Sequence, residues 1–309
     1  MSYIAKEFIE TAEGLLFAIV VNGTENDNVL CFLRYVIDNG VLKKCDTNTA
    51  NQLLKNQFPD YLYFSPRLQA QLHAVPIKNI VKHHKPQQRL DDILHAEPKN
   101  SVQQDCVALC QLFESKGIDL NLMGITGSLL IGAENDASDI DLVCYDKIMF
   151  HQCRSAIRKL IAEKSLKQLL KKDWQESFKR RHCELDFDDY VWHEKRKFNK
   201  ALINGRKFDL SFLNLHQQDS KEQYKKCGTA TIQARVSDDS GAFDYPAEYK
   251  IFGCEIKSVV SFTATYIGQA KKGELIEAQG QLEENQHGVQ RLVIGSSREA
   301  KGEYIRVFG

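Results

Sequence analysis

The sequence lacks the features that mark membrane and secreted proteins. Its longest apolar run, Leu15 to Val21, is far shorter than the ~20 residues that a helix needs to cross a bilayer. The first residues include an acidic side chain, Glu7, and no basic stretch precedes an apolar one, so a signal peptide is not expected. We therefore predict a cytoplasmic protein that does not interact with a membrane.

The sequence also lacks an excess of charge and any regular cysteine pattern. Its 41 Lys and Arg residues balance 41 Asp and Glu residues, which excludes a global electrostatic case for nucleic-acid binding, so any basic surface must be local. The nine cysteines are odd in number and widely spaced, without a C-x-x-C pair. This pattern argues against a disulfide framework and a structural zinc site, and it favours reduced thiols.

What is present is an ordinary globular composition, 43% apolar and 27% charged, in a chain long enough for two or three domains. We predict an α+β protein with three parts. A small α/β region spans residues 1–98, a central domain with a mixed sheet and helices spans 99–225, and a small β-barrel spans 226–309.

The first part opens with two strand-like stretches, Gly14 to Val21 and Asn28 to Asp38, joined by a polar turn. Helices are expected around Thr49–Asn56 and Ile77–His84. The histidines of this part have no acidic or cysteine partner at ligand spacing, and we interpret them as surface residues: His73, His83, His84 and His95.

The last part is rich in Thr, Val, Ile, Tyr and Gly, with turn signals every 8–12 residues. Five short strands in some 80 residues are typical of a small β-barrel, and the oligonucleotide-binding (OB) barrel is one option. The expected strands are Thr229–Val236, Ala247–Phe252, Ser258–Tyr266, Glu274–Leu282 and Gln290–Gly295. Aromatic rings on these strands can stack bases, but packing in the core is the favoured interpretation.

The stretch that carries chemistry lies in the central part. Gly127 and Ser128 follow a predicted strand and open an apolar helical turn, where free backbone N–H groups and a hydroxyl suit a phosphate. After ten intervening residues, Asp139 and Asp141 alternate with apolar residues, so we expect both carboxylates to project from one face of a strand. Such neighbouring carboxylates repel each other unless a cation lies between them.

Mg²⁺ suits this arrangement, because it takes one or two carboxylates together with phosphate oxygens. Two such ions, ~3.5–4 Å apart, can activate an attacking hydroxyl and stabilise leaving pyrophosphate. The pattern therefore predicts phosphoryl or nucleotidyl transfer with two Mg²⁺ ions, or with Mn²⁺ in their place.

The Gly-Ser turn, the ten-residue spacing and the Asp-Ile-Asp-Leu run together resemble the signature of the DNA polymerase β-like nucleotidyltransferase superfamily. The chain is also similar to a little-characterised, mainly archaeal group of predicted nucleotidyltransferases, through Glu7 to Thr11 and Ser296 to Ala300. The resemblance implies transfer of a nucleoside monophosphate from a nucleoside triphosphate (NTP), such as ATP, to a hydroxyl group. It also implies that Asp139 and Asp141 bind metal and that Gly127 and Ser128 hold phosphate.

The sequence alone leaves two features of this resemblance open, the residue four positions after the motif glycine and the third carboxylate. Many relatives place an arginine or another polar residue four positions after the motif glycine, and here that residue is Ile131. The superfamily also has a third carboxylate on a later strand. Asp209 is preferred as this metal-binding and catalytic residue, because it alternates with Phe208 and Leu210; the rival is the alternating run Glu184 to Asp188.

The segment between the acid-bearing strands, Arg154 to Lys207, contains sixteen basic and eight acidic residues. One interpretation is a pair of solvated helices. The other is a basic face beside the carboxylates that binds triphosphate or a polyanionic acceptor. The candidate residues for that face are Lys179, Arg180, Arg181, Arg196 and Lys200.

The expected function is thus a metal-dependent nucleotidyltransferase that releases pyrophosphate, with Asp139, Asp141 and Asp209 as catalytic residues. The acceptor, whether nucleic acid, protein or small molecule, and the oligomeric state stay open, because the motif handles only metal and phosphate. The alternative is a non-catalytic protein that binds nucleotide or nucleic acid on the same fold. A third and weaker option is a toxin–antitoxin or protein-nucleotidylating role.

Overall fold

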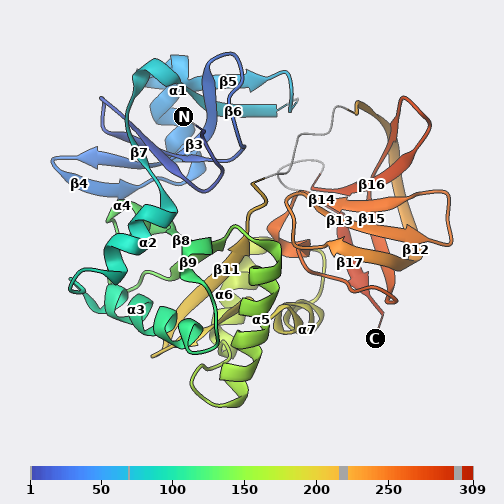
Figure 1. The fold of residues 1–309 in the computed structure, drawn as a ribbon. Coiled ribbons are helices and arrows are strands. Elements are labelled where there is room, and N and C mark those ends of the chain that lie inside the picture. The colour runs from blue at the N-terminus through green and yellow to red at the C-terminus, as the bar shows by residue number, and fades with distance from the viewer. Residues whose placement is uncertain (1, 69, 216–221, 296–300, 309) are drawn as a thin grey trace. The chain divides into compact units, whose positions relative to one another are not determined.

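The computed structural model in Figure 1 describes residues 2–68, 70–215, 222–295 and 301–308. These residues form three β-sheets and seven α-helices, which confirms the predicted mixture of helices and sheets. Within the same residues, no helix is long and apolar enough to cross a membrane. The chain divides into two compact units, one of Met1–Tyr145 with Phe208–Leu210 and one of Asp146–Lys207 with Ser211–Gly309. The predicted three-domain division stays a prediction.

The first sheet is antiparallel in every described pairing and has the strand order β5-β6-β3-β2-β1-β7, with β4 paired to β3. The predicted pairing of the first two long strand stretches is confirmed by β2 and β3. Helix α1 (Thr47–Gln57) confirms the helix expected there. The strands are β1 (Phe8–Thr11), β2 (Leu15–Ile19), β3 (Asn28–Asp38), β4 (Val41–Lys44), β5 (Leu62–Ser65), β6 (Ala70–Pro76) and β7 (Ile80–His84).

Both faces of this sheet are buried, which explains why β2 is a continuous apolar run rather than an alternating one. Leu15 and Phe17 point to the face covered by α1, where they pack in a cluster with Leu54. Leu16 points to the other face and packs in a cluster with Leu130, which comes from the Gly-Ser helical turn. The first sheet is therefore built directly against the motif.

The helix expected over Ile77–His84 is wrong. A short 3₁₀ helix, η2 (Ile77–Asn79), leads into strand β7, which pairs with β1. The open edge of β1 provides backbone partners that a local reading of the sequence does not include, and this tertiary pairing overrides local propensity. The helix begins later, at α2 (Pro86–Leu94), where Pro86 occupies a first-turn position that needs no N–H.

Two helices precede the second sheet (Figure 1). Helix α3 (Ser101–Glu114) has Asn100 as its N-cap, whose side chain accepts a hydrogen bond from Gln103 N–H. Helix α2 packs closely on the second sheet, since a Cβ at Gly124, in a strand of that sheet, would lie 2.7 Å from Pro86 Cβ. The 3₁₀ helix η3 (Leu120–Leu122) leads into the same strand.

The second sheet has the order β10-β11-β9-β8 and carries the motif. Strand β8 (Met123–Thr126) pairs antiparallel with β9 (Ile140–Cys144), and the short helix α4 (Gly127–Ile131) follows β8 directly. Strand β11 (Arg206–Phe212) alternates as predicted, with Phe208, Leu210 and Phe212 buried. Strand β10 (Lys200–Ile203) precedes it, and the connecting helices are α5 (Lys147–Ala162), α6 (Lys171–Arg181) and α7 (Phe187–Lys197).

The third sheet has a strand at each of the five expected places and adds a sixth, but the strand expected over Ser258–Tyr266 ends at Ser261 and the 3₁₀ helix η4 (Ala264–Tyr266) follows it. Strand β12 pairs with both β13 and β15, and β14 and β16 complete a circuit of five paired strands. All described pairings in it are antiparallel except β14 with β16. The strands are β12 (Tyr224–Gly241), β13 (Ala247–Phe252), β14 (Ser258–Ser261), β15 (Leu275–Asn285), β16 (Gln290–Ile294) and the unpredicted β17 (Tyr304–Val307).

Candidate functional site

The turn between β8 and α4 is fixed by two glycines. Gly127 (φ +67°) begins α4 and Gly132 (φ +72°) ends it, and both adopt the left-handed conformation that glycine accepts without strain. The backbone therefore leaves the sheet, makes little more than one helical turn and returns. The predicted glycine turn that opens an apolar helix is confirmed, with Leu129 and Leu130 buried.

Gly127 lies directly against one of the predicted metal-binding carboxylates. Thr126, the last residue of β8, is opposite Asp141 in the β8–β9 register. A Cβ at Gly127 would collide with Asp141 Oδ2 and would lie 3.2 Å from Asp141 Cγ. The glycine is thus required twice, for its backbone conformation and for the space that the carboxylate occupies.

The charges of the three predicted carboxylates interact, but Asp139 lies one residue before β9 and not on the strand with Asp141, as was predicted. Strand β11 is the neighbour of β9 in the sheet, which sets Asp209 beside Asp141. The pKa of Asp141 is raised to about 6, first by burial, then by the charge of Asp209, and also by the charge of Asp139. The charges of Lys6 and Lys44 oppose this rise. Such crowding of carboxylates costs free energy, and bound cations would offset that cost.

Lys6 is the main residue of this site that sequence reasoning missed. Its backbone is joined to the motif, because Thr126 Oγ1 donates a hydrogen bond of 2.7 Å to Lys6 C=O. Burial lowers the pKa of the Lys6 ammonium, while the charges of Asp209 and Asp141 raise it. Lys6 lies 120 residues before Thr126 in the chain, so no local sequence pattern connects it with the motif.

Ser128 lies in the first turn of α4 and is half-buried. Its backbone carbonyl accepts hydrogen bonds from the N–H groups of Gly132 and Ala133, the second at 2.9 Å. These bonds close the small helix and hold the turn in shape. The predicted contact of Ser128 with phosphate stays a prediction.

Oxygen ligands are the only kind that these three carboxylates offer, which suits Mg²⁺ or Mn²⁺ rather than a softer metal. In the ranges that the structure describes, no group of three His, Cys, Asp or Glu side chains is gathered closely enough to hold a metal ion. The carboxylates therefore form an open set. Mg²⁺ is compatible with such a set, because it keeps waters and takes phosphate oxygens as further ligands.

The rival carboxylates, Glu184 to Asp188, do not form a strand. Asp186 is the N-cap of α7, where its carboxylate accepts a hydrogen bond of 2.8 Å from Asp189 N–H. Arg306 forms ion pairs with both Asp186 and Asp189. Asp186 therefore caps a helix and pairs with an arginine within the second unit, and the choice of Asp209 as the third carboxylate stays a prediction.

The basic segment is partly neutralised within its own unit. Arg196 forms an ion pair with Glu274, which directly precedes β15, and Lys200 forms one with the buried Glu194. Lys197, which was not a candidate, also binds Glu194, at 2.5 Å, and donates to Thr265 C=O at 2.7 Å. Two of the five candidate residues thus have acidic partners, and Lys179 and Arg180 on α6 are exposed. Triphosphate or polyanion binding by this segment stays a prediction.

The surface interpretation of the histidines is wrong for three of them. His73 is buried, where its Nδ1 accepts a hydrogen bond of 2.9 Å from Leu33 N–H, and burial lowers its pKa to about 4. His83 and His84 on β7 pair with Glu7, which directly precedes β1, and with Glu10 on β1. These partners are about 75 residues away in sequence and meet through the β1–β7 pairing, so local spacing does not reveal them. His95 is exposed, as predicted.

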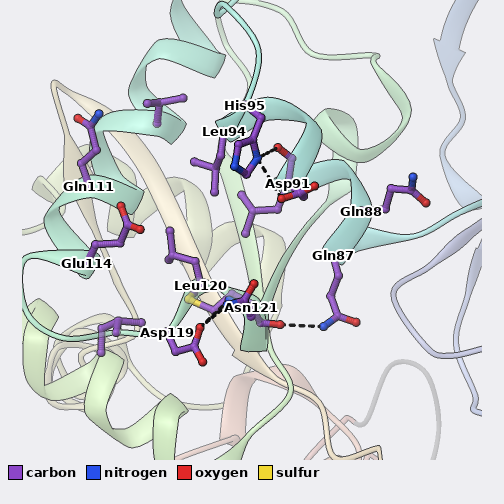
Figure 2. Close-up of a pocket in the computed structure, with 14 residues that line it drawn as sticks. Gln87, Gln88, Asp91, Leu94, His95, Gln111, Glu114, Asp119, Leu120 and Asn121 are labelled. Atoms are coloured by element: carbon purple, nitrogen blue, oxygen red, sulfur yellow. Dashed lines mark hydrogen bonds and ion pairs between the residues drawn. The ribbon is translucent and has the colours of Figure 1, made fainter.

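A separate pocket of about 760 Å³ lies between α2, α3 and η3 (Figure 2). Its wall is mainly polar, with Gln87, Asp91, Glu114 and Asp119 among the lining residues, and Gln87 donates a hydrogen bond of 3.0 Å to Asn121 C=O. Met123, the first residue of β8, also lines it, whereas the carboxylates meet at the other end of this strand. Four extended residues span roughly 13 Å, so the pocket and the carboxylate site are distinct.

The chain is 34% identical to "Uncharacterized protein MJ1086" of Methanocaldococcus jannaschii, and the match covers 98% of each chain. No protein-family model matches the sequence. No solved structure matches it either.

Proposed function

This chain belongs to the same family as MJ1086 of Methanocaldococcus jannaschii, and for it we propose the activity of a metal-dependent nucleotidyltransferase. The enzyme transfers a nucleoside monophosphate from an NTP to an acceptor hydroxyl and releases pyrophosphate. The observation that carries the proposal is the convergence of Asp139, Asp141 and Asp209 beside the Gly127 turn. The wider likeness to archaeal nucleotidyltransferases includes Ser296 to Ala300, which lie outside the described residues.

Each part of the site has a role in this proposal. Asp139 and Asp141 hold Mg²⁺, with Asp209 as the third carboxylate, and the metal would supply charge to polarise the phosphates. Gly127 lets the backbone pass close to the carboxylate and, with Ser128, faces the phosphates. The acceptor oxygen forms a bond to the α-phosphorus as the bond to the bridging oxygen breaks, and pyrophosphate leaves. A carboxylate, for which we propose Asp209, accepts the proton of the acceptor hydroxyl.

The strand pairing supports a further part of the proposal, the small barrel. In the circuit β12-β13-β14-β16-β15-β12, a single parallel pair closes an otherwise antiparallel ring, as in an OB-type barrel. We propose that this barrel accompanies a nucleotidyltransferase domain built on the second sheet. We also propose that the protein acts in the cytoplasm.

The deciding experiment is transfer of label from each α-³²P-labelled NTP, with Mg²⁺ or Mn²⁺. The acceptors are total RNA, lysate proteins and small hydroxyl compounds. We expect labelling of one acceptor class, lost in Asp139→Ala with an unchanged circular dichroism spectrum. The matched control is Asp92→Asn, an exposed acid on α2 of the same unit, which should retain full activity.

The proposal fails if no acceptor is labelled and if NTP with Mg²⁺ gives no thermal shift. Labelling that survives in both Asp139→Ala and Asp141→Ala would also contradict it, because the chemistry would then lie elsewhere in the chain.

A second candidate function, non-catalytic nucleic-acid binding, is supported by one surface feature of the third sheet. Tyr245 and Phe262 are both exposed, and their ring centroids lie 6.4 Å apart in an edge-to-face arrangement. Exposed rings of this kind can stack bases. Against it, residues 226–309 contain ten basic and eleven acidic residues, so no charge excess attracts a polyanion. RNA affinity that survives Asp139→Ala but is lost in Tyr245→Ala would favour this candidate over the enzyme.

A further inference from the structure

The position where relatives carry a polar residue, Ile131, is occupied here by apolar packing. Ile131 packs against the cluster formed by Phe8, Leu16 and Tyr35 of the first sheet together with Leu130 of α4. An apolar side chain offers no donor to a phosphate oxygen. Residue 131 therefore packs against the first sheet and makes no polar contact with phosphate. Any such contact has to come from another element.

The segment just before β1 reaches the motif and carries a cation. Lys6 N–H donates a hydrogen bond of 2.9 Å to Ile19 C=O, and Lys6 C=O accepts one of 2.7 Å from Thr126 Oγ1. Thr126 is the residue immediately before Gly127. These two bonds fix the Lys6 backbone both to the first sheet and to the turn that begins α4.

The backbone at Lys6 lies in a β-turn, which is closed by a hydrogen bond of 3.2 Å from Glu7 N–H to Ile4 C=O. Its φ is +71°, as the third residue of such a turn can require. The neighbouring bond from Ile19 N–H to Glu7 C=O, of 2.9 Å, continues this anchoring. The Lys6 ammonium is held where it interacts with Asp209 and Asp141.

A second cation from the same sheet lies on the same side. Lys44 on β4 is opposite Tyr35 on β3 in the register, and the charges of both Lys44 and Lys6 act on Asp141. Lys44 is exposed. Its neighbour Lys43, by contrast, is bound to Asp38 at 2.5 Å. The first sheet and the segment before it thus contribute two lysines whose charges act on Asp141, and a third lysine that is paired with Asp38.

We propose that Lys6, assisted by Lys44, binds the triphosphate of the incoming NTP in place of the polar side chain that is absent at residue 131. This inference rests on the proposed function. A lysine ammonium is a common point-charge partner of phosphate. Bound metal would neutralise the carboxylates. The Lys6 ammonium would then be free to bind the negatively charged phosphates. The first sheet is then part of the substrate site and not only a structural neighbour of it.

The test measures binding of inorganic tripolyphosphate, and of each of the four ribonucleoside triphosphates, to the full chain with Mg²⁺ by calorimetry. Lys6→Met should weaken binding about 10- to 100-fold, the effect of losing one charged hydrogen bond. Lys6→Arg retains the charge and should stay within about threefold to tenfold of the wild type. Lys44→Met should cost about threefold, and the matched control Lys43→Met should change nothing.

A different outcome separates a phosphate contact from a mere counter-ion of the carboxylates. If Lys6 only neutralises Asp141 and Asp209, Lys6→Met should bind Mg²⁺-tripolyphosphate as tightly as the wild type or more tightly, and this result would overturn the inference. A wild-type chain that binds none of the probes would overturn the proposed function together with the inference. Unchanged binding in Lys6→Met, with the wild type active, would overturn the inference alone.

A measurement on the wild-type chain covers the case in which Lys6→Met does not fold. Reductive methylation, mapped by mass spectrometry, reports the accessibility of each lysine amine. Tripolyphosphate with Mg²⁺ should protect Lys6 at least about threefold relative to Mg²⁺ alone, and Lys43 should react equally in both conditions. Equal methylation of Lys6 with and without tripolyphosphate would contradict the proposed contact.

Discussion

The chain contains two clusters of charged side chains with poor access to water, and they are built in opposite ways. In the second unit, Glu194 has two cations bound to it, Lys197 and Lys200, and its pKa falls to about 2 even though burial alone would raise it. At the candidate site, Asp141 has other carboxylates beside it, and its pKa rises to about 6. The same kind of group is thus compensated in one place and crowded in the other.

The difference in charge balance suits the two clusters to different roles. A compensated pair joins elements, as Lys197 does through its bond to Thr265 C=O. A crowded set of carboxylates stores unfavourable free energy, which a bound cation would release. The fold is therefore able to neutralise a buried acid and does not fully do so at Asp141, which agrees with the metal site that we propose.

The largest effect should come from breaking the compensated cluster. Lys197→Met leaves Glu194 with a single partner in a buried place, and we expect a loss of about 3–5 kcal/mol in the free energy of unfolding. Urea denaturation measures it. The matched control is Lys195→Met, an exposed position on the same helix, which should change the stability by less than about 0.5 kcal/mol. Equal stability of the two variants would show that the Glu194 cluster contributes nothing.

At the crowded cluster around Asp141, a substitution should raise the free energy of unfolding instead of lowering it. Asp141→Asn removes a charge that the fold disfavours, so in the absence of divalent metal it should stabilise the chain by about 1–3 kcal/mol at pH 7. Asp92→Asn, an exposed acid, should not. A destabilised Asp141→Asn variant at pH 7 would mean that the carboxylate is well compensated, which would remove the contrast.

The pH dependence of this difference follows from the pKa values. Asp141 has a pKa of about 6 in the folded chain against 3.8 ordinarily, so between about pH 4 and pH 6 the folded chain holds a proton that the unfolded chain has released. The stabilisation of the folded chain by the protonated Asp141 carboxyl group is complete below about pH 4, and it is lost as the pH rises through 6. The stabilities of wild type and Asp141→Asn should therefore converge below pH 4. Added Mg²⁺ should raise the melting temperature of the wild type only.

The smallest effect on stability concerns the glycines at the two ends of α4. Gly127→Ala and Gly132→Ala both place a side chain at positive φ, which should cost each about 1–2 kcal/mol. Only the Gly127 Cβ meets Asp141, whereas nothing lies within 4 Å of a Cβ at Gly132. Nucleotidyl transfer should therefore be lost in Gly127→Ala and retained in Gly132→Ala. Equal activity of the two variants would show that the closeness of Gly127 to Asp141 does not matter for activity.

Much of this site could be predicted because its parts are local. Apolar alternation around Asp209 predicts a strand with one polar face, and β11 has it. The glycine turn is likewise encoded by adjacent residues. The strand β7 and the pairing of His83 with Glu7 could not be predicted, because they depend on which strand edge is free in the folded chain.

By itself, the sequence determined that Asp141 and Asp209 lie on strands between buried apolar residues and where the backbone turns, since both follow from the two-residue repeat of a strand and the freedom of glycine. Only the tertiary structure decided which charges surround those carboxylates. Lys6 reaches Thr126 across 120 residues because the two faces of the first sheet are buried, one of them against Leu130 of α4. Electrostatic interactions depend on distance in space, and distance in space between remote residues is set by packing.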